Sequence, residues 1–407
     1  MKCGLLGRKL GHSYSPQIHA LLGNYSYQLF EKEPEEIGDF LKNGDFTGLN
    51  VTIPYKKEVI PFLDELSPAA ARLGAVNTIV RRDGKLIGHN TDYFGFRRLV
   101  QESGLQVAGK KVLVLGSGGA SSTAVAVLQE LGAKVTVISR SGENNYENLD
   151  RHADAAVIAN TTPVGMYPNT GKSALSLEGF PRLEGVLDAV YNPARTQILL
   201  DAERRGLAAV NGLWMLVAQA KESAEWFTGE EIPDSRIAKI HHALRLQMEN
   251  IILIGMPGCG KTAVGQQLAQ KLGKKFVDAD ESLEARVCRK ITDIIPNDGE
   301  AAFREMESET LAELGKQSGL VIATGGGCVT QPQNYPLLHQ NGTIFWLKRE
   351  LDRLPTDGRP LSQKRTLGQM YEARMPLYLR FADAAISNDG SIAETASAIC
   401  RKLEETT

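Results

Sequence analysis

Cysteine is scarce in this sequence, and its pattern excludes several classes of protein. Five cysteines occur among 407 residues, at widely spaced positions and without a C-x-x-C pair. Disulfide scaffolds and structural zinc sites need paired cysteines, whereas isolated thiols are typical of a reducing cytoplasm. We therefore expect free cysteines and a cytoplasmic location.

Long apolar runs and an excess of charge of one sign are also missing. No apolar stretch approaches the ~20 residues of a membrane span, and residues 1–16 lack the pattern of a signal peptide. The formal net charge of −2 gives no electrostatic reason to expect nucleic acid or an anionic membrane as a partner. With 42% hydrophobic and 23% charged residues, the sequence is typical of a globular protein of roughly two to three domains.

A phosphate-binding loop stands late in the chain. The apolar run at residues 251–254 leads into a glycine-rich turn that matches G-x-x-x-x-G-K-[ST]. Its residues are Gly255, Gly258, Gly260, Lys261 and Thr262. The backbone N–H groups of such a loop hold nucleotide phosphates, while the lysine reaches the outer phosphates and the hydroxyl meets Mg²⁺. The motif alone does not separate a kinase from a GTPase or a motor, but the ~158 residues that remain are typical of one small-molecule kinase domain.

Two carboxylates and a second glycine turn follow this loop. Asp278 and Asp280 end a second predicted strand, where Asp278 can share the Mg²⁺ shell and Asp280 can remove a proton from an acceptor hydroxyl. A third predicted strand, residues 320–323, leads into Gly325, Gly326 and Gly327 and has no terminal Asp. Metal binding is therefore assigned to Thr262 and Asp278, and the glycine turn is expected to approach a ligand by its backbone. Three arginines complete the candidate site: Arg304 on a helix that faces the cleft, Arg359 in a mobile basic loop and Arg374.

The first 96 residues carry polar segments that are ambiguous one by one. They are S-x-S-P at Ser13 and Ser15, N-V-T-x-P-x-K from Asn50 to Lys56, G-A-V-N-T at Asn77 and N-T-D ending at Asp92. Ser-Pro can simply start a helix, an isolated lysine is usually exposed, and Asn and Asp favour turns. A lysine held beside a carboxylate in a closed pocket, however, can supply a proton to a ketone oxygen as a hydride arrives.

Residues 97–211 contain a dinucleotide-binding pattern. A buried strand at 111–115 runs into Gly116, Gly118, Gly119 and Ala120, then a helix and a second strand at 134–138. Ser121 stands where the general fingerprint has its third glycine. The second strand ends in Ser139, Arg140 and Ser141 without an acidic residue, and an arginine there pairs with a 2′-phosphate. We therefore predict NADP as the cofactor in preference to NAD.

The ordered motifs of residues 1–248 resemble the shikimate dehydrogenase family. This resemblance implies that Lys56 and Asp92 form the catalytic pair. It implies a substrate site made of Ser13, Ser15, Thr52, Asn77, Asp92 and Gln219. It also places Asn160, Thr161, Tyr191, Gly212 and Met215 near the cofactor, although Met215 alone fits plain core packing.

Residues 250–407 resemble shikimate kinase, on the motifs G-x-x-G-x-G-K-T, D-x-D, F-R-x-x-E, T-G-G-G, R-P-L and R-x-P-L-Y. The resemblance implies catalysis by Asp280 and Lys261, and ATP binding by Gly258, Gly260, Lys261, Thr262 and Arg359. It implies shikimate binding by Asp280, Arg304, Gly325, Gly326, Gly327 and Arg374.

The sequence therefore predicts an α/β protein that fuses two enzymes. We expect a discontinuous substrate domain (1–96 and 212–248), an NADP-binding Rossmann domain (97–211) and a P-loop kinase domain with a parallel sheet (249–407). The expected ligands are NADP(H), ATP, Mg²⁺ and the small molecules 3-dehydroshikimate and shikimate. Two alternatives stay open: a first enzyme that prefers quinate and NAD, and a non-catalytic sensor of pathway metabolites.

Overall fold

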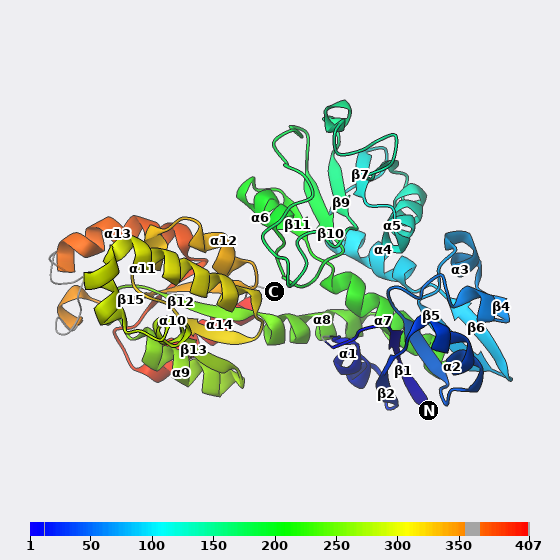
Figure 1. Ribbon diagram of the computed structural model, residues 1–407, viewed down its shortest axis with the longest axis horizontal. Helices are drawn as coiled ribbons and strands as arrows, with labels where there is room; N and C mark the ends of the chain where they lie inside the picture. Colours follow the sequence, from blue (N-terminus) through cyan, green and yellow to red (C-terminus); the bar gives the residue numbers. More distant parts are fainter. Residues whose placement is uncertain (12, 355–366, 406–407) are drawn as a thin grey trace. The chain divides into compact units, whose positions relative to one another are not determined.

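The structure is a computed structural model that describes residues 1–11, 13–354 and 367–405. These residues form two compact units, each described by itself below (Figure 1). Unit 1 contains Met1–Met166, Lys172–Tyr191 and Ile198–Ala243, and unit 2 contains Tyr167–Gly171, Asn192–Gln197 and Leu244–Thr407. Helix α8 (Ser235–Met248) begins in unit 1 and ends in unit 2.

The first sheet of unit 1 is mixed, with the strand order β2-β1-β3-β5-β6-β4. Its strands are β1 (Lys2–Gly7), β2 (Ser26–Glu31), β3 (Gly48–Val51), β4 (Glu65–Leu66), β5 (Thr78–Arg82) and β6 (Lys85–His89). Its helices are α1 (Ser15–Leu22), α2 (Ile37–Asn43) and α3 (Pro68–Leu73), with α7 (Leu213–Thr228) returning to contact α1, β3 and β5. Leu49 and Val51 of β3 pack with α2, so Asn50 between them points to the opposite face, where α7 lies.

The second sheet of unit 1 is parallel, with the order β11-β10-β9-β7-β8. Its strands are β7 (Lys111–Leu115), β8 (Lys134–Ile138), β9 (Val157–Asn160), β10 (Gly185–Asp188) and β11 (Ala208–Val210). Helices α4 (Asp92–Glu102) and α5 (Gly119–Glu130) cover one face, and α6 (Gln197–Arg204) covers the other. The strand order reverses direction between β7 and β9, and ligands of such sheets bind at the carboxyl ends of the strands at this point.

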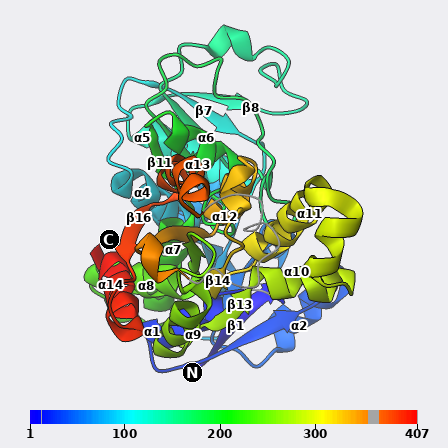
Figure 2. The same ribbon diagram turned by 90° about the vertical axis from the view of Figure 1, so that its left-hand side faces the viewer.

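Unit 2 is built on one parallel sheet, with the order β13-β14-β12-β15-β16. Its strands are β12 (Asn250–Ile254), β13 (Lys275–Asp278), β14 (Leu320–Ala323), β15 (Gly342–Lys348) and β16 (Ala384–Ser387). Its helices are α9 (Lys261–Leu272), α10 (Ala279–Val287), α11 (Ile291–Lys316), α12 (Asn334–His339), α13 (Leu367–Phe381) and α14 (Ile392–Glu405). Helices α9 and α14 pack side by side, as Figure 2 shows, and α11 packs on α12. Every residue of β12 is buried, so the phosphate loop follows the central strand of a closed core.

The predicted fold class is confirmed, with one local correction. Asp280 does not end a strand, because β13 stops at Asp278 and Asp280 lies in the first turn of α10. The side chain of Asp278 caps this helix by accepting from the Asp280 and Glu281 N–H groups at 3.0 and 3.4 Å. In the described part of the chain, no helix combines the length and apolar character needed to cross a membrane. The limits predicted for the three domains stay a prediction.

Two candidate active sites

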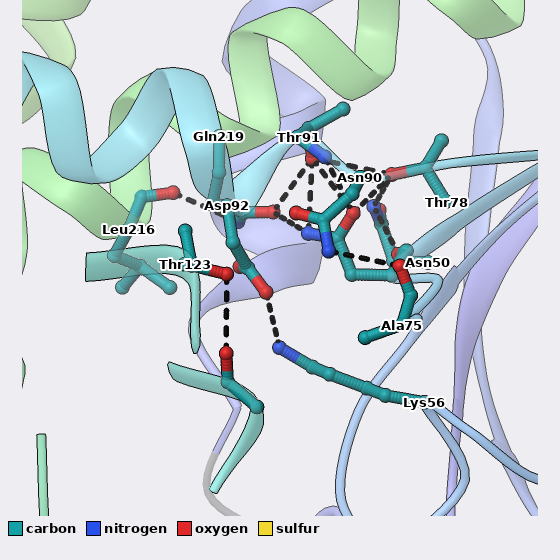
Figure 3. A network of polar contacts seen from close by, with 12 residues as sticks. Asn50, Lys56, Ala75, Thr78, Asn90, Thr91, Asp92, Thr123, Leu216 and Gln219 are labelled. Carbon is teal, nitrogen blue, oxygen red and sulfur yellow. Dashed lines mark hydrogen bonds and ion pairs between the residues drawn. The ribbon is translucent and has the colours of Figure 1, made fainter. Parts of the chain in front are cut away.

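The first site is organised around an ion pair between Lys56 and Asp92. Lys56 lies in the turn after β3, and Asp92 is the first residue of α4, where the helix dipole favours a carboxylate. The Lys56 Nζ atom lies 2.5 Å from Asp92 Oδ2, and the two side chains are 24% and 9% exposed (Figure 3). The structure thus joins the two residues that the sequence assigned to proton transfer, in a place largely shielded from water.

Two amide side chains lie next to this pair. Asn77 accepts the Thr91 N–H at 2.7 Å and donates to the Thr91 hydroxyl at 3.0 Å, which ties it to the residue before Asp92. The Asn77 Nδ2 atom also lies 3.5 Å from Gln219 Oε1 of α7. Three of the predicted substrate residues, Asn77, Asp92 and Gln219, therefore gather in one place, although they come from three separate parts of the chain.

The remaining predicted substrate residues lie in the turns that border the first sheet. Ser13 and Ser15 sit together at the start of α1, where the Ser13 hydroxyl accepts the Ser15 N–H at 3.2 Å. Thr52 directly follows β3 and donates its N–H to the Leu6 carbonyl of β1 at 2.9 Å. No hydrogen bond between described residues joins Ser13 or Thr52 directly to the Lys56–Asp92 pair, so their place in a shared substrate site stays a prediction.

The glycine turn after β7 has the features of a phosphate-binding turn. Gly116 has φ +108°, and a Cβ there would lie 3.1 Å from the Thr161 hydroxyl, so a larger residue would be strained. Helix α5 starts at Gly119 without a side-chain cap or an acidic residue in its first turn, which suits an anion. The Ser121 hydroxyl donates to the Gly116 carbonyl at 2.7 Å. The serine that replaces the third glycine of the fingerprint thus closes the turn by its side chain.

The other predicted cofactor residues lie at the same edge of the second sheet. Ser139, Arg140 and Ser141 follow β8, with Arg140 and Ser141 exposed, while Asn160 ends β9 and Thr161 follows it. Asn160 is buried and donates to Asp188 Oδ1 at 2.9 Å, so it joins the carboxyl ends of β9 and β10. Ala120 lies in the first turn of α5.

Of three further predicted cofactor residues, Tyr191 follows β10, Gly212 precedes α7 and Met215 lies in the first turn of α7. Burial raises the pKa of Tyr191, whose ring packs edge-on against Tyr14 at 6.2 Å. A Cβ at Gly212 would overlap the Ala189 carbonyl, and Met215 is 9% exposed. The residues fit a nucleotide with a charged 2′ substituent, because the glycine turn, the helix start and Arg140 all offer positive or N–H groups.

The second site is a cavity of about 490 Å³ in unit 2. It collects nearly all the kinase residues predicted from the sequence: Gly258, Gly260, Lys261, Thr262, Asp278, Asp280, Arg304, Gly325, Gly326, Gly327 and Arg374. Arg359 lies outside the described residues. The cavity also includes Glu307 and the apolar side chains Ile291, Ile295, Phe303 and Met370, to which the sequence analysis assigned no role.

Electrostatics distinguish Asp280 from its neighbours. Burial, followed by the charges of Glu307 and Asp278, raises the pKa of Asp280 to about 6. Glu307 is also buried, and burial raises its pKa although the Arg304 guanidinium, 2.7 Å away, opposes this. A carboxylate with a raised pKa is a stronger base once it is ionised, which suits removal of a proton from a hydroxyl.

The glycine turn and Arg374 form the opposite wall. Arg374 donates to the Gly326 carbonyl at 3.2 Å, and the Tyr378 hydroxyl donates to the same oxygen at 2.5 Å. A Cβ at Gly325 would lie 2.6 Å from Glu307 Oε1 and 2.8 Å from Asp280 Oδ1. The turn therefore brings backbone against the acidic side chains, while its approach to a ligand stays a prediction.

The phosphate loop supplies the nucleotide end of the cavity. Gly258 and Gly260 have φ +82° and +97°, and α9 starts after Gly260 without a side-chain cap. Lys261 Nζ donates to the Gly255 and Met256 carbonyls, both at 3.0 Å. The Thr262 hydroxyl lies 3.0 Å from Asp278 Oδ2. These two oxygen donors at the loop fit Mg²⁺, which is bound through few protein ligands together with water and phosphate oxygens.

Comparisons with known proteins agree with the two sites. The family model for the shikimate dehydrogenase substrate-binding domain matches residues 5–79, and that for shikimate kinase matches residues 257–404. The NADP(+) shikimate dehydrogenase of Clostridium perfringens (strain SM101 / Type A) is 37% identical over 264 residues, covering 60% of this chain and 97% of the relative. That of Thermococcus kodakarensis is 39% identical over 248 residues, covering 56% and 90%.

Solved structures give the same picture. Shikimate dehydrogenase 1 of Peptoclostridium difficile shares 38% identity with a TM-score of 0.56, over 60% of this chain and 98% of its own. A quinate dehydrogenase of Corynebacterium glutamicum in complex with NAD shares 28% identity with a TM-score of 0.55, over 60% and 99%. The chain therefore belongs to the shikimate dehydrogenase family and continues into a shikimate kinase domain, which makes it a bifunctional enzyme.

Proposed function

We propose that the first site reduces 3-dehydroshikimate to shikimate with NADPH, and that the second phosphorylates the 3-hydroxyl of shikimate with ATP. The observation that carries the proposal is the presence, on one chain, of the shielded Lys56–Asp92 pair and of the cavity that joins Lys261 to Asp280. The two families have shikimate in common, as product of one reaction and substrate of the other.

At the first site, NADPH supplies a hydride when bound, and the chain provides the proton and the alignment. Lys56 gives a proton to the ketone oxygen, and Asp92 holds the ammonium group in place. Asn77, Gln219 and Thr52 orient the ring hydroxyls, and Ser13 and Ser15 take the carboxylate. The glycine turn at Gly116 and the Arg140 guanidinium select a phosphorylated dinucleotide.

At the second site, Asp280 accepts the proton of the shikimate 3-hydroxyl, and its raised pKa makes it a fitting base. Arg304 and Arg374 bind the shikimate carboxylate by charge-assisted hydrogen bonds. Lys261 reaches the outer phosphates, and Thr262 and Asp278 hold Mg²⁺, which neutralises charge on the transferred group. We also propose the domain limits 1–96 with 212–248, 97–211 and 249–407.

A coupled assay tests the proposal. Purified protein is given 3-dehydroshikimate, NADPH and MgATP, and shikimate 3-phosphate is measured. We expect Lys56→Ala to abolish ketone reduction while shikimate phosphorylation continues, and Lys261→Ala to do the reverse. Each variant thus controls for the folding of the other, and loss of both activities in either one would contradict two independent sites.

Quinate with NAD is the second candidate for the first site, since a quinate dehydrogenase shares its fold. The exposed Arg140 at the end of β8 favours NADP, because an NAD enzyme usually has a carboxylate there. Comparing kcat/KM for shikimate and quinate with NADP and NAD separates the two. A non-catalytic sensor, the third reading, is excluded if both half-reactions turn over at ordinary enzyme rates.

A further inference from the structure

Ser223 is a fully buried serine on α7 that lies where three substrate-site elements meet. Its side chain is 0% exposed, although it is polar. Its hydroxyl lies 2.8 Å from Asn50 Nδ2 of β3, 2.8 Å from the Thr78 hydroxyl of β5 and 2.9 Å from the Thr91 hydroxyl before α4. It also donates to the Gln219 main-chain carbonyl at 2.9 Å. One side chain thus links α7 to the elements that carry the predicted substrate residues.

Each of the two neighbouring amides accepts a hydrogen bond through its oxygen. The Tyr27 hydroxyl donates to Asn50 Oδ1 at 2.7 Å. The Thr91 N–H donates to Asn77 Oδ1 at 2.7 Å. The Nδ2 groups of both amides are therefore turned toward the hydroxyls of Ser223 and Thr91.

The two amides supply donors to the hydroxyl cluster. Ser223 accepts from Asn50, and Thr91 accepts from Asn77, so donors enter the cluster from two sides. Between the Ser223, Thr78 and Thr91 hydroxyls either oxygen can donate, and the Ser223 hydroxyl reaches the Gln219 main-chain oxygen at 2.9 Å. Gln219 lies one helical turn before Ser223, so fixing Ser223 also fixes the height and rotation of Gln219.

The network continues from Asn50 to Tyr27 of β2. The Tyr27 hydroxyl donates to Asn50 Oδ1 at 2.7 Å. Tyr27, Asn50 and Ser223 therefore form a continuous path from β2 through β3 to α7. A buried polar network in which the members are satisfied is rigid, because each lost bond leaves an unpaired group.

We propose that Ser223 is a positioning residue for the dehydrogenase substrate. It fixes Gln219 against Asn77 and the Lys56–Asp92 pair, and through Asn50 it ties α7 to Tyr27 of β2. The site then selects a ring whose ketone and hydroxyls have one fixed separation. This inference rests on the proposed reduction of 3-dehydroshikimate at this site.

Ser223→Ala tests the role of the hydroxyl. Removing it takes away the nearest acceptor of Asn50 Nδ2, which lies at 2.8 Å against 3.3 Å for the Thr78 hydroxyl, so we expect the KM for 3-dehydroshikimate to rise about fivefold to thirtyfold. The KM for NADPH should stay within about twofold, because well-separated sites act independently. Shikimate phosphorylation by the same polypeptide should be unchanged.

Thr228→Val is the matched control on the same helix. The Thr228 hydroxyl also donates to the carbonyl four residues earlier, at 2.9 Å, but it lies outside the cluster. Thr228→Val removes the same kind of side-chain hydrogen bond to the helix backbone, so a general weakening of α7 would affect both variants. Tyr27→Phe provides a second route to the network, since it deletes only the group that orients Asn50, and it should raise the same KM by a smaller factor.

The double variant Gln219→Ala with Ser223→Ala decides whether Ser223 acts through Gln219. We expect the second substitution to add little once Gln219 is absent. Additive effects, an equal rise in the KM for NADPH, or an equal effect of Thr228→Val would overturn the inference. A wild-type protein that does not reduce 3-dehydroshikimate would instead refute the proposed function. In that case the inference falls with it.

Discussion

Replacing Asp280 by Asn should stabilise unit 2 at neutral pH while abolishing kinase activity. Asp280 is a partly buried carboxylate whose pKa rises from an ordinary 3.8 to about 6 through burial, Glu307 and Asp278. The folded state therefore resists losing the proton that the unfolded chain releases readily. A catalytic base of this kind is kept at the expense of stability.

The size of the effect follows from the two pKa values. Below about pH 3.8 the group is protonated in both states and contributes nothing. Between the two values the unfolded state loses its proton first, and stability falls as the pH rises, by about 1.4 kcal/mol for each pKa unit. Above about pH 6 the penalty levels off at about 2–3 kcal/mol, once water at the open side of the site is allowed for. Above about pH 6, Asp280→Asn should recover the whole of this penalty. At pH 5 only about half of the penalty has developed, so the variant should recover only that half.

Amide hydrogen exchange of β12 and β14 measures this difference in unit 2 alone. Wild type and Asp280→Asn are compared at pH 5 and pH 8, after correction for the intrinsic exchange rate. Glu281→Gln, an exposed acid one position further along the same helix, is the control and should change stability by less than about 0.5 kcal/mol. Equal stabilisation at both pH values, or destabilisation at pH 8, would refute the assigned ionisation.

Three further predictions concern the cofactor, the phosphate loop and the kinase pH profile. Arg140→Ala should raise the KM for NADPH about tenfold to a hundredfold, because a charge-assisted contact is lost, and should leave the KM for NADH nearly unchanged. Equal rises in the two KM values would contradict the assignment of Arg140 to a 2′-phosphate. Asn388→Ala removes the 2.6 Å hydrogen bond to the Cys259 carbonyl that holds the phosphate loop, so the KM for ATP should rise about threefold to tenfold without a change in the KM for shikimate; an unchanged KM for ATP would count against this. The kcat/KM of the kinase for shikimate should fall as the pH drops below about 6, where Asp280 becomes protonated; a profile flat down to pH 5 would exclude Asp280 as the base.

Residues that belong to short motifs could be predicted from the sequence. Lys261 and Thr262 are fixed by the glycine pattern around them, and the structure places them at the start of α9 after a buried strand. The Lys56–Asp92 pair was predicted from its family motifs, and the structure places Lys56 Nζ in direct contact with Asp92 Oδ2. Local sequence decides such residues because the turn that presents them is itself encoded by neighbouring glycines and prolines.

The supporting residues could not be predicted in this way. Ser223 contacts Asn50 across 173 residues of chain, and Asn388 contacts Cys259 across 129. Neither has a local pattern, because a serine in a helix and an asparagine after a strand are common. The one usable signal was the helical spacing of Ser223 from Gln219, which places both on one side of α7. The acidity of Asp280 likewise depends on Glu307, whose approach is set by the packing of α10 on α11.

The glycine turn of unit 2 has a consequence for how this gene tolerates change. A Cβ at Gly325 meets Asp280 and Glu307, at Gly326 it meets Pro257, and at Gly327 it overlaps the Arg304 guanidinium. Every codon change away from glycine adds at least that carbon. At each of the three successive positions, a side chain therefore forces a different neighbour to move out of its place. In a library of all single substitutions, variants of this turn should rescue a strain that lacks only the dehydrogenase and fail in one that lacks only the kinase.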